Sequence, residues 1–158
     1  MAQPLLKPDC LGAGFGDFLL DLLGRVYAVS CADVVNLEIY PREVGDESRH
    51  FSVGDDGLMG LAKNLIALGT GSGVPLIFPW LLGANVAAFP ELPLLREKGV
   101  MAVLVYPLQI SPDKSLGRVV ILSSTALDET LTDLRYSFLE SLAVQLTLAI
   151  EAFNRQPV

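Results

Sequence analysis

Two apolar segments near the middle of the chain, residues 100–110 and 116–124, carry the clearest pattern in the sequence. Both are rich in β-branched residues, and the polar residues 111–115 between them favour a turn. A parallel crossover needs about a dozen residues, so this short connection predicts an antiparallel hairpin. Alternate residues of a strand point to opposite sides, and in both segments both sides are apolar. The pattern therefore predicts a sheet that is covered by a layer on each face.

Apolar residues that recur every three or four positions predict the helices. The predicted helices span residues 17–30, 57–68, 92–98 and 130–154. Asp56 is placed to cap the second of these helices, and Gly99 is placed to end the third in a left-handed conformation. Thr130 and Asp133 have the spacing of a capping box at the start of the last helix.

Three further strands are predicted outside the central hairpin. Residues 33–40 predict a strand in which positions 35, 37 and 39 are apolar and share one face, while positions 36, 38 and 40 are polar and share the other. Residues 50–53 would pair with them as a second hairpin, and residues 75–78 form a short strand. Gly and Pro are frequent in the segment that follows, and its apolar loop at 80–89 is of a kind that often covers or binds ligands.

Length and composition fit a single domain. The chain has 158 residues, of which 51% are hydrophobic and 18% are charged, and its mean hydropathy is +0.48. These values argue against disorder and leave apolar surface for an interface. Pro and Gly residues within 1–16 indicate a tail or linker, so the domain is predicted to span residues 17–155, with a short tail at 156–158.

The charge and the cysteine content limit the partners and the compartment. With 11 Lys and Arg residues against 18 Asp and Glu residues, the net charge is −7, and without a basic run nucleic acid is not expected as a partner. The uncharged stretch 64–90 is interrupted by Gly and Pro too often to form a membrane-spanning helix. Cys10 and Cys31 form neither a metal motif nor a disulfide framework, and no secretion signal is present, so we expect a cytoplasmic domain with reduced thiols.

The order of these elements, together with several short motifs, resembles that of a GAF domain. The motifs are Pro-Leu at 107–108 near the end of a strand, Leu-Gly at 116–117 at the start of the next, and Ala-Ile at 149–150 in the last helix. The resemblance covers residues 17–153. It implies an α+β fold of three layers: a central antiparallel sheet of five or six strands, the N- and C-terminal helices on one face, and a pocket segment on the other.

GAF domains form a regulatory family whose members bind cyclic nucleotides, tetrapyrroles, haem or small metabolites, or only dimerise. Some members attach a bilin through a cysteine in the pocket, and members that reduce methionine sulfoxide use several cysteines in the pocket loops. This chain has no cysteine after Cys31, so neither subtype is expected. The cyclic-nucleotide signature is missing too, since Asn64 follows Lys63 instead of preceding it. His50, the single histidine, falls near the predicted sheet edge, where a surface position is favoured over a haem ligand. The sequence therefore argues against covalent bilin and haem as cofactors and leaves the ligand unidentified.

Six residues are candidates for contacts to a small molecule: Asn36, Glu38, Trp80, Asn85, Arg96 and Tyr106. The first two share the polar face of strand 33–40, which looks into the pocket if the strand is central, although a solvent-facing edge position is favoured. The tryptophan and asparagine of the apolar loop could form a lid with one orienting amide, or they could pack the loop or contact a second chain. The arginine could pair with an anionic ligand, but a solvated helix charge is favoured. The tyrosine is predicted to lie in the core with its hydroxyl bonded locally.

The last helix is longer than a sheet of this width needs for cover. Its apolar stripe runs for roughly six turns, about 35 Å at 1.5 Å per residue. Part of this stripe could bind a second copy of the chain, with the terminal helices forming a four-helix bundle in a homodimer. The residues predicted for this interface are Phe138, Leu142, Leu146, Ile150 and Phe153.

The sequence contains no nucleophile elbow, metal-binding pair or phosphate loop, so we expect no catalytic activity within these residues. The favoured function is a regulatory domain that senses a small molecule and signals to an attached or partner module, such as a histidine kinase, a transcriptional activator or a cyclic-dinucleotide enzyme. The alternative is a degenerate GAF domain that mediates dimerisation or protein association without a ligand. A haem sensor or an enzyme that uses His50 is a third hypothesis.

Overall fold

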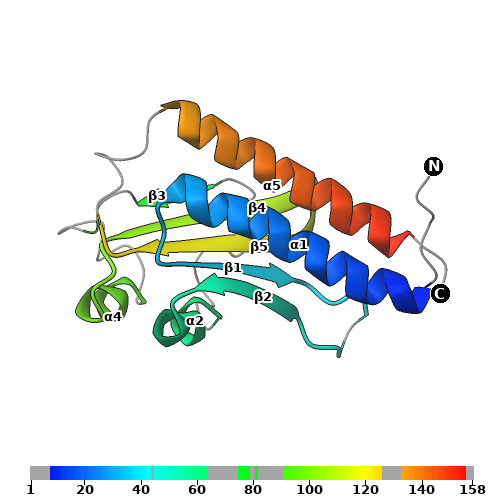
Figure 1. The fold of residues 1–158 in the computed structure, drawn as a ribbon, viewed down its shortest axis with the longest axis horizontal. Helices are drawn as coiled ribbons and strands as arrows, with labels where there is room; N and C mark the ends of the chain where they lie inside the picture. Colours follow the sequence, from blue (N-terminus) through cyan, green and yellow to red (C-terminus); the bar gives the residue numbers. More distant parts are fainter. Residues whose placement is uncertain are drawn as a thin grey trace.

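A five-stranded antiparallel sheet forms the middle layer of the computed structural model (Figure 1). The structure describes residues 8–43, 45–63, 75–78, 81, 91–125 and 133–155. The strands follow one another across the sheet in the order β2-β1-β5-β4-β3. Their bounds are β1 Val34–Ile39, β2 Arg49–Gly54, β3 Leu76–Phe78, β4 Ala102–Ser111 and β5 Lys114–Ser123. All five predicted strands are confirmed, with ends no more than two residues from those expected.

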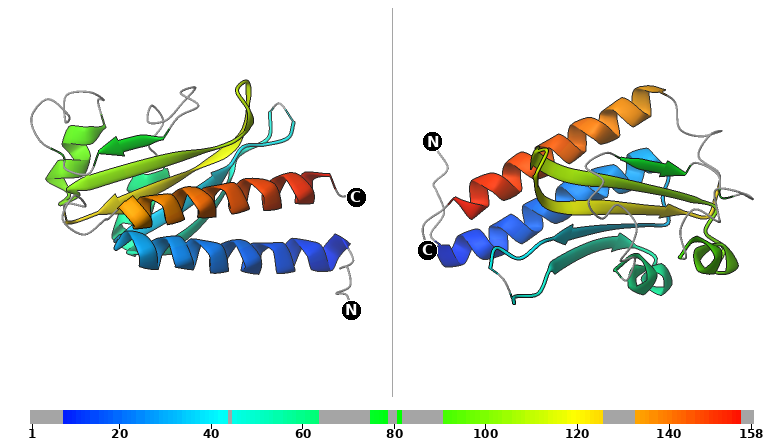
Figure 2. Two further views of the ribbon diagram at one scale, coloured as in Figure 1. Left: turned by 90° about the horizontal axis from the view of Figure 1, so that it is seen from above. Right: turned by 180° about the vertical axis from the view of Figure 1, so that it is seen from behind.

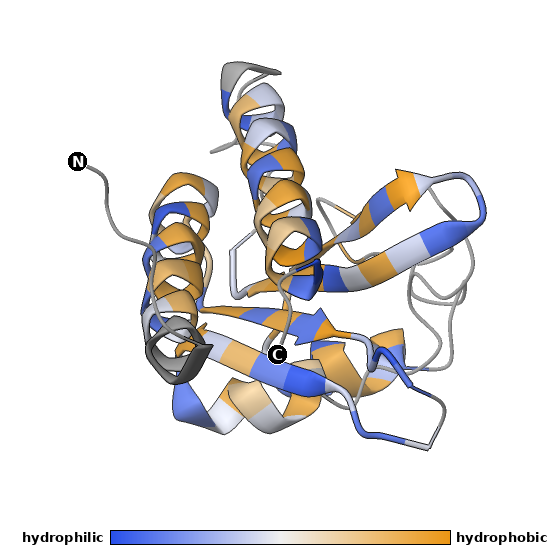
Figure 3. Ribbon diagram, turned by 90° about the vertical axis from the view of Figure 1, so that its right-hand side faces the viewer, coloured by the Kyte–Doolittle hydropathy of each residue, from blue (hydrophilic) through white to orange (hydrophobic). Residues whose placement is uncertain are grey.

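The predicted central hairpin consists of β4 and β5, and its strands are antiparallel. Tyr106 pairs with Val119, and the register shifts between Leu108 and Gln109. Because β5 also pairs with β1, the hairpin joins the two halves of the sheet. Figure 3 shows hydrophilic residues at the turn between β4 and β5, in keeping with the polar connection in the sequence.

Helices cover both faces of the sheet. α1 (Pro8–Ser30) and α5 (Asp133–Asn154) lie side by side on one face (Figure 2). α2 (Asp56–Lys63) and α4 (Leu92–Glu97) lie on the other face (Figure 1). The α+β fold with three layers, predicted from the sequence, is therefore confirmed.

Alternate strand residues divide between two apolar cores, one for each face. Leu37 and Leu104 belong to the core under α1 and α5. Val34 and Val103 belong to the second core, together with residues of α2 and α4. The strands are apolar on both sides because each side packs against a different layer.

α1 begins earlier than the sequence predicts. The expected start is Asp17, with a tail or linker before it, but the helix begins at Pro8. Proline fits the first turn of a helix because its missing amide hydrogen has no partner to lose there. Phe15 lies in the added part and stacks on Phe153 of α5, with ring centroids 4.2 Å apart, which offsets the low helix propensity of the nearby glycines. The linker prediction is therefore wrong for residues 8–16, and the tails at 1–7 and 156–158 lie outside the described residues.

α2 is capped by a different residue from the one predicted. The backbone amide of Gly57 donates a hydrogen bond to Asp55 Oδ1 at 2.7 Å, and the next two amides donate to the Asp55 carbonyl oxygen. Asp55 is therefore the cap, whereas Asp56, the predicted cap, is the first helical residue. The predicted continuation of this helix over residues 64–68 lies outside the described residues.

The ends of the other helices follow their sequence signals. Gly99, after α4, has φ +89°, the left-handed conformation that favours glycine. α5 ends at Asn154 as expected, and Thr130 of the predicted capping box lies outside the described residues. Within the described ranges, no helix has the length and apolar character needed to cross a membrane.

Candidate functional site

Five polar side chains gather on the sheet face that α2 and α4 share. They are Asn36 and Glu38 of β1, His50 and Ser52 of β2, and Arg118 of β5, and we call them the polar cluster. Asn36 lies opposite Ser52, while Glu38 lies opposite His50 on one side and Arg118 on the other. Paired residues of a sheet project from the same face, so three adjacent strands bring these side chains together.

Asn36 is the most deeply buried member of the polar cluster, with 1% of its surface exposed. Its amide nitrogen lies 3.2 Å from His50 Nδ1, and its amide oxygen accepts a hydrogen bond from the Ser52 hydroxyl at 2.6 Å. The favoured interpretation of this strand face as solvent-facing is therefore wrong for Asn36. The cause lies in the tertiary arrangement: β1 lies between β2 and β5 and packs against α2, so the Asn36 side chain is covered and bonds to residues of β2.

His50 lies on the edge strand β2, as its sequence position predicts. It is half-buried, and its ring contacts the Asn36 amide instead of only facing water. The structure thus places the single histidine of the chain within the polar cluster.

An ion pair joins β5 to β1 inside the polar cluster. Arg118 Nε donates to Glu38 Oε1 at 3.0 Å, and the two side chains are 6% and 17% exposed. Glu38, expected to face solvent, is instead largely covered. Burial of charges costs free energy, and the attraction between them offsets this cost only while both partners are in place. Burial also raises the pKa of the nearby Tyr40 phenol, a shift that the positive charge of Arg118 opposes.

Arg118, like Ser52, is a member of the polar cluster that the sequence motifs do not single out. A signal for it exists in the sequence, because this arginine interrupts a strand that is apolar on both faces. A charge in such a place needs a buried partner. The partner lies 80 residues away in the chain, and only the pairing of β1 with β5 shows that it is Glu38.

Buried apolar residues border the polar cluster on the same face. They come from the sheet and from both covering helices: Val34, Val103, Val105, Val120, Leu122, Ala62, Leu92 and Leu95. A largely apolar surface with a few fixed polar groups is the usual composition of a small-molecule site. The face can therefore offer hydrogen bonds and one guanidinium–carboxylate pair beside a hydrophobic surface.

A cavity of about 620 Å³ lies at one end of this face, between the start of α2 and the residues after α4. Asp33, Asp55 and Lys98 bring charge to its wall, and Leu58 and Leu61 of α2 bring apolar surface. The Asp33 carboxylate accepts a hydrogen bond from the Ser124 amide. The cavity is thus polar at the strand ends and apolar along α2.

The other predicted ligand contacts do not join the polar cluster where the structure describes them. Arg96 is exposed on α4, in agreement with a solvated charge. Tyr106 lies on the opposite face of the sheet, in the core under α1 and α5. Its core position is as predicted, but among the described residues its hydroxyl has no hydrogen-bond partner, so the expected local bond is wrong there. Trp80 and Asn85 lie outside the described residues.

The residues predicted for a dimer interface on α5 are largely used within the molecule. Leu142, Leu146 and Ile150 are at most 1% exposed and pack under α5, so their assignment to an interface is wrong. Phe153 is half-buried in its stack with α1, whereas Phe138 is 47% exposed. An apolar stripe on a helix indicates that this face of the helix is buried. The stripe does not show whether the face packs against the sheet of the same chain or against a second chain.

Comparisons with known proteins identify the fold. No family model matches the sequence, and no curated protein matches it. Among solved structures, a domain assigned to a two-component sensor histidine kinase from Sinorhizobium meliloti 1021 matches with a TM-score of 0.66 at 13% identity, over 88% of this chain and 92% of that chain. A GAF domain/HD domain protein from Geobacter sulfurreducens matches with a TM-score of 0.63 at 14% identity, over 99% and 100% of the two chains.

A third similar structure is the photoproduct state of GAF3 from Slr1393 of Synechocystis sp. PCC6803. It has a TM-score of 0.62 and 15% identity, and the match covers 86% of this chain and 92% of that chain. The chain therefore has the fold of a GAF domain, as the sequence motifs predict. Where the structure describes the chain, no group of three or more His, Cys, Asp or Glu residues is placed to hold a metal ion.

Proposed function

We propose that this chain is a regulatory GAF domain that binds a small molecule on the sheet face of the polar cluster and signals to an attached or partner module. The observation that carries the proposal is the burial of amide, imidazole, hydroxyl and ion-pair groups on three adjacent strands beside an apolar surface. Buried polar groups cost stability unless they are bonded, and functional sites are a common reason for keeping them. The cavity at the end of this face has a volume in the range of small-molecule sites, and it is lined by residues next to the polar cluster in the chain, not by the cluster itself.

The topology supports a route from this face to a neighbouring module. β1 follows α1 directly in the chain, and both strands of the ion pair, β1 and β5, pack under α1 and α5 on their other side. A ligand that changes the spacing of these strands would therefore change the packing of the terminal helices. The attached module could be a histidine kinase, a transcriptional activator or a cyclic-dinucleotide enzyme, and the proposal includes no catalytic role for the domain itself.

The test is native mass spectrometry of the purified protein, followed by thermal-shift screening against nucleotides and metabolites. A bound ligand should raise the unfolding temperature of the wild-type protein, because it stabilises the folded state alone. Asn36→Ala should abolish the shift, while Gln145→Ala, which alters an exposed residue on α5, should keep it. An equal shift in both variants, or no ligand in either experiment, would contradict the proposal.

A second candidate function is protein association without a ligand. It is favoured by the exposed apolar side chains on the outer surfaces of the terminal helices. Phe18 is 49% exposed on α1, and Phe138, Val144 and Leu148 are 47%, 57% and 60% exposed on α5. Exposed apolar side chains of this size on two neighbouring helices are typical of interfaces between subunits. A homodimer through these helices would also be compatible with sensing on the opposite face of the sheet.

The third hypothesis, a haem sensor or an enzyme that uses His50, has its own test. His50→Ala should leave the absorption spectrum of the purified protein unchanged if the ring serves only to bond Asn36. Loss of a haem absorption band, or loss of an activity, in this variant would instead favour the third hypothesis.

A further inference from the structure

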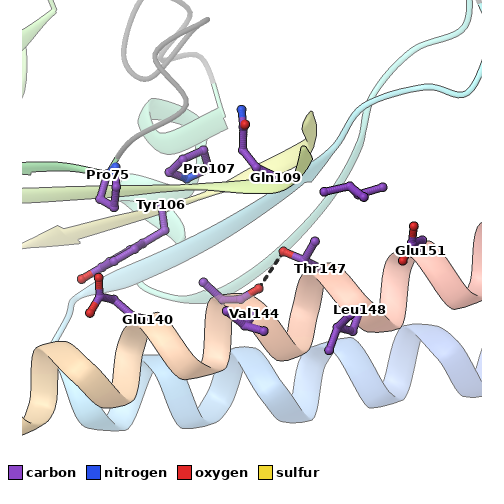
Figure 4. Close-up of a pocket in the computed structure, with 11 residues that line it drawn as sticks. Pro75, Tyr106, Pro107, Gln109, Glu140, Val144, Thr147, Leu148 and Glu151 are labelled. Atoms are coloured by element: carbon purple, nitrogen blue, oxygen red, sulfur yellow. Dashed lines mark hydrogen bonds between the residues drawn. The ribbon is translucent and has the colours of Figure 1, made fainter. Parts of the chain in front are cut away.

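A groove separates β4 from α5, on the sheet face opposite the polar cluster (Figure 4). Its volume is about 320 Å³, at the lower end of the range for small-molecule sites. Tyr106 and Pro107 of β4 form one wall, while Val144 and Leu148 of α5 form the other. The two residues of α5 are 57% and 60% exposed, so the apolar wall is open to solvent.

A buried hydroxyl at this groove lacks a partner. Tyr106 is 3% exposed, and its hydroxyl makes no hydrogen bond in the structure. In Figure 4 the hydroxyl points toward the carboxylate of Glu140. Burial raises the pKa of the Tyr106 phenol, and the negative charge of Glu140 raises this pKa further. A ligand that carries hydrogen-bond donors and positive charge would satisfy both oxygen-bearing groups at this end of the groove.

A second carboxylate lies toward the other end of the groove. Glu151 is eleven residues after Glu140 on α5, a separation of about 16 Å at 1.5 Å per residue. Glu151 forms an ion pair with Arg155 at 3.0 Å, but Arg155 is 75% exposed and does not line the groove. Among the described lining residues there is no Lys or Arg. The groove is acidic at both ends, and between them apolar side chains lie beside the polar side chains of Gln109 and Thr147.

The open edge of β4 is poorly suited to an added strand. Pro107 has no amide hydrogen to donate, and the register of β4 shifts at Gln109. Recognition in the groove must therefore rely on side chains. The acidic ends, with apolar and polar side chains between them, fit an extended chain of methylene groups that carries ammonium groups at its ends and along its length.

We propose that the β4–α5 groove binds a linear aliphatic polyamine, with one ammonium group at Glu140 and Tyr106, a second at Glu151, and the methylene chain along Val144 and Leu148. Each ammonium group donates to a carboxylate, and the one beside Tyr106 also donates to the phenol oxygen. The methylene groups cover the exposed apolar wall. This site is separate from the one in the proposed function, because the sheet lies between them.

The test is a titration of the isotopically labelled full chain with spermine, followed by NMR of the Val and Leu methyl groups. Spermine should shift the methyl signals of Val144 and Leu148 with saturation at one equivalent. Butylamine, which has a single ammonium group, should bind at least tenfold more weakly, as expected when two ends are recognised. Equal affinity for the two amines would overturn the proposal, as would shifts that leave Val144 and Leu148 unaffected.

Matched variants distinguish specific binding of spermine in the groove from its general attraction to an acidic protein. Glu140→Gln and Glu151→Gln should each weaken spermine binding about two- to fivefold, the effect of losing one exposed ion pair. Tyr106→Phe should weaken it without loss of folding, since the removed hydroxyl has no partner. Glu97→Gln, on exposed α4, should leave the affinity unchanged. If Glu97→Gln weakens binding as much as Glu140→Gln does, the attraction is non-specific and the proposal fails.

Discussion

Gly117 lets β5 approach β1 at a place where no side chain fits. A Cβ atom at this position would collide with the carbonyl oxygen of Glu38 on the neighbouring strand. The residue is also part of the Leu-Gly motif on which the resemblance to GAF domains rests. The motif therefore has a structural explanation: it allows close contact of the two strands that carry the ion pair of the polar cluster.

We expect Gly117→Ala to lower the free energy of unfolding by about 1–3 kcal/mol, because the strands must move apart to accommodate the methyl group. Gly60→Ala is the matched control, since a Cβ atom at Gly60, inside α2, meets nothing within 4 Å. The control should raise stability by about 0.5–1 kcal/mol through helix propensity. Urea denaturation of both variants measures the difference. Equal effects of the two substitutions would show that the strands tolerate a side chain at Gly117.

We expect the burial of Tyr106 to lower the free energy of unfolding at alkaline pH. Its pKa is raised in the folded protein by burial and by Glu140. Below a pH of about 10 the phenol is protonated in both the folded and the unfolded states, so it causes no pH dependence. Above that pH the unfolded chain releases the proton while the folded chain retains it, and the free energy of unfolding falls. In Tyr106→Phe, denaturation between pH 9 and 11 should show a smaller decrease than in the wild type, and an identical decrease would contradict this assignment.

Two neighbouring acidic residues have different roles at the start of α2. The side chain of Asp55 accepts the hydrogen bond of a helix cap, whereas Asp56 is placed to interact only with the helix dipole. Their order cannot be deduced from the pair Asp55-Asp56 alone, since either residue suits a cap. The outcome depends on Gly54, whose φ of +121° redirects the chain as it leaves β2.

We expect Asp55→Ala to lower the free energy of unfolding by about 1 kcal/mol, the usual cost of losing a helix cap. Asp56→Ala should cost less, about 0.3–1 kcal/mol at low salt, and this cost should diminish as salt is added. Chemical denaturation at two salt concentrations separates the effects. A larger loss for Asp56→Ala would restore the sequence-based prediction of the cap.

In the molecule as a whole, the outer surfaces of α1 and α5 carry exposed apolar side chains. The inner surfaces are used up by the core, so a homodimer through these helices would involve their exposed apolar residues in place of the buried Leu142, Leu146 and Ile150. These exposed residues are Phe18, Leu20, Phe138, Val144 and Leu148. This set also shares Val144 and Leu148 with the groove proposed to bind a polyamine. A dimer that covered these two residues would compete with spermine.

We expect the wild-type chain to sediment as a dimer at tens of micromolar and the variant Phe18→Ser/Phe138→Ser to sediment as a monomer. Removing two large apolar contacts weakens association, because such residues dominate the free energy of interfaces. Leu94→Ser is the control, since Leu94 is 47% exposed on α4, on the other face of the sheet. A monomeric wild type would remove the basis for the dimer, and a monomeric control would move the interface to α4.

Local sequence patterns were sufficient to predict the elements of this protein and their layers. Strand and helix periodicities depend on neighbours within a few residues, and for this reason the five strands and the end of α5 are close to their predicted positions. The length of the connection between β4 and β5 also determined that these strands are antiparallel. Two apolar faces on each central strand required two covers, and both are present.

The orientation of the polar residues and the length of α1 depend instead on contacts between distant parts of the chain. The interaction partners of Asn36 lie 14 and 16 residues away, and that of Glu38 lies 80 residues away, so their burial depends on strand order, which no local pattern specifies. The start of α1 depends likewise on the contact of Phe15 with Phe153 at the far end of the chain. A sequence states which residues need partners, whereas the choice among distant partners is made when the whole chain packs.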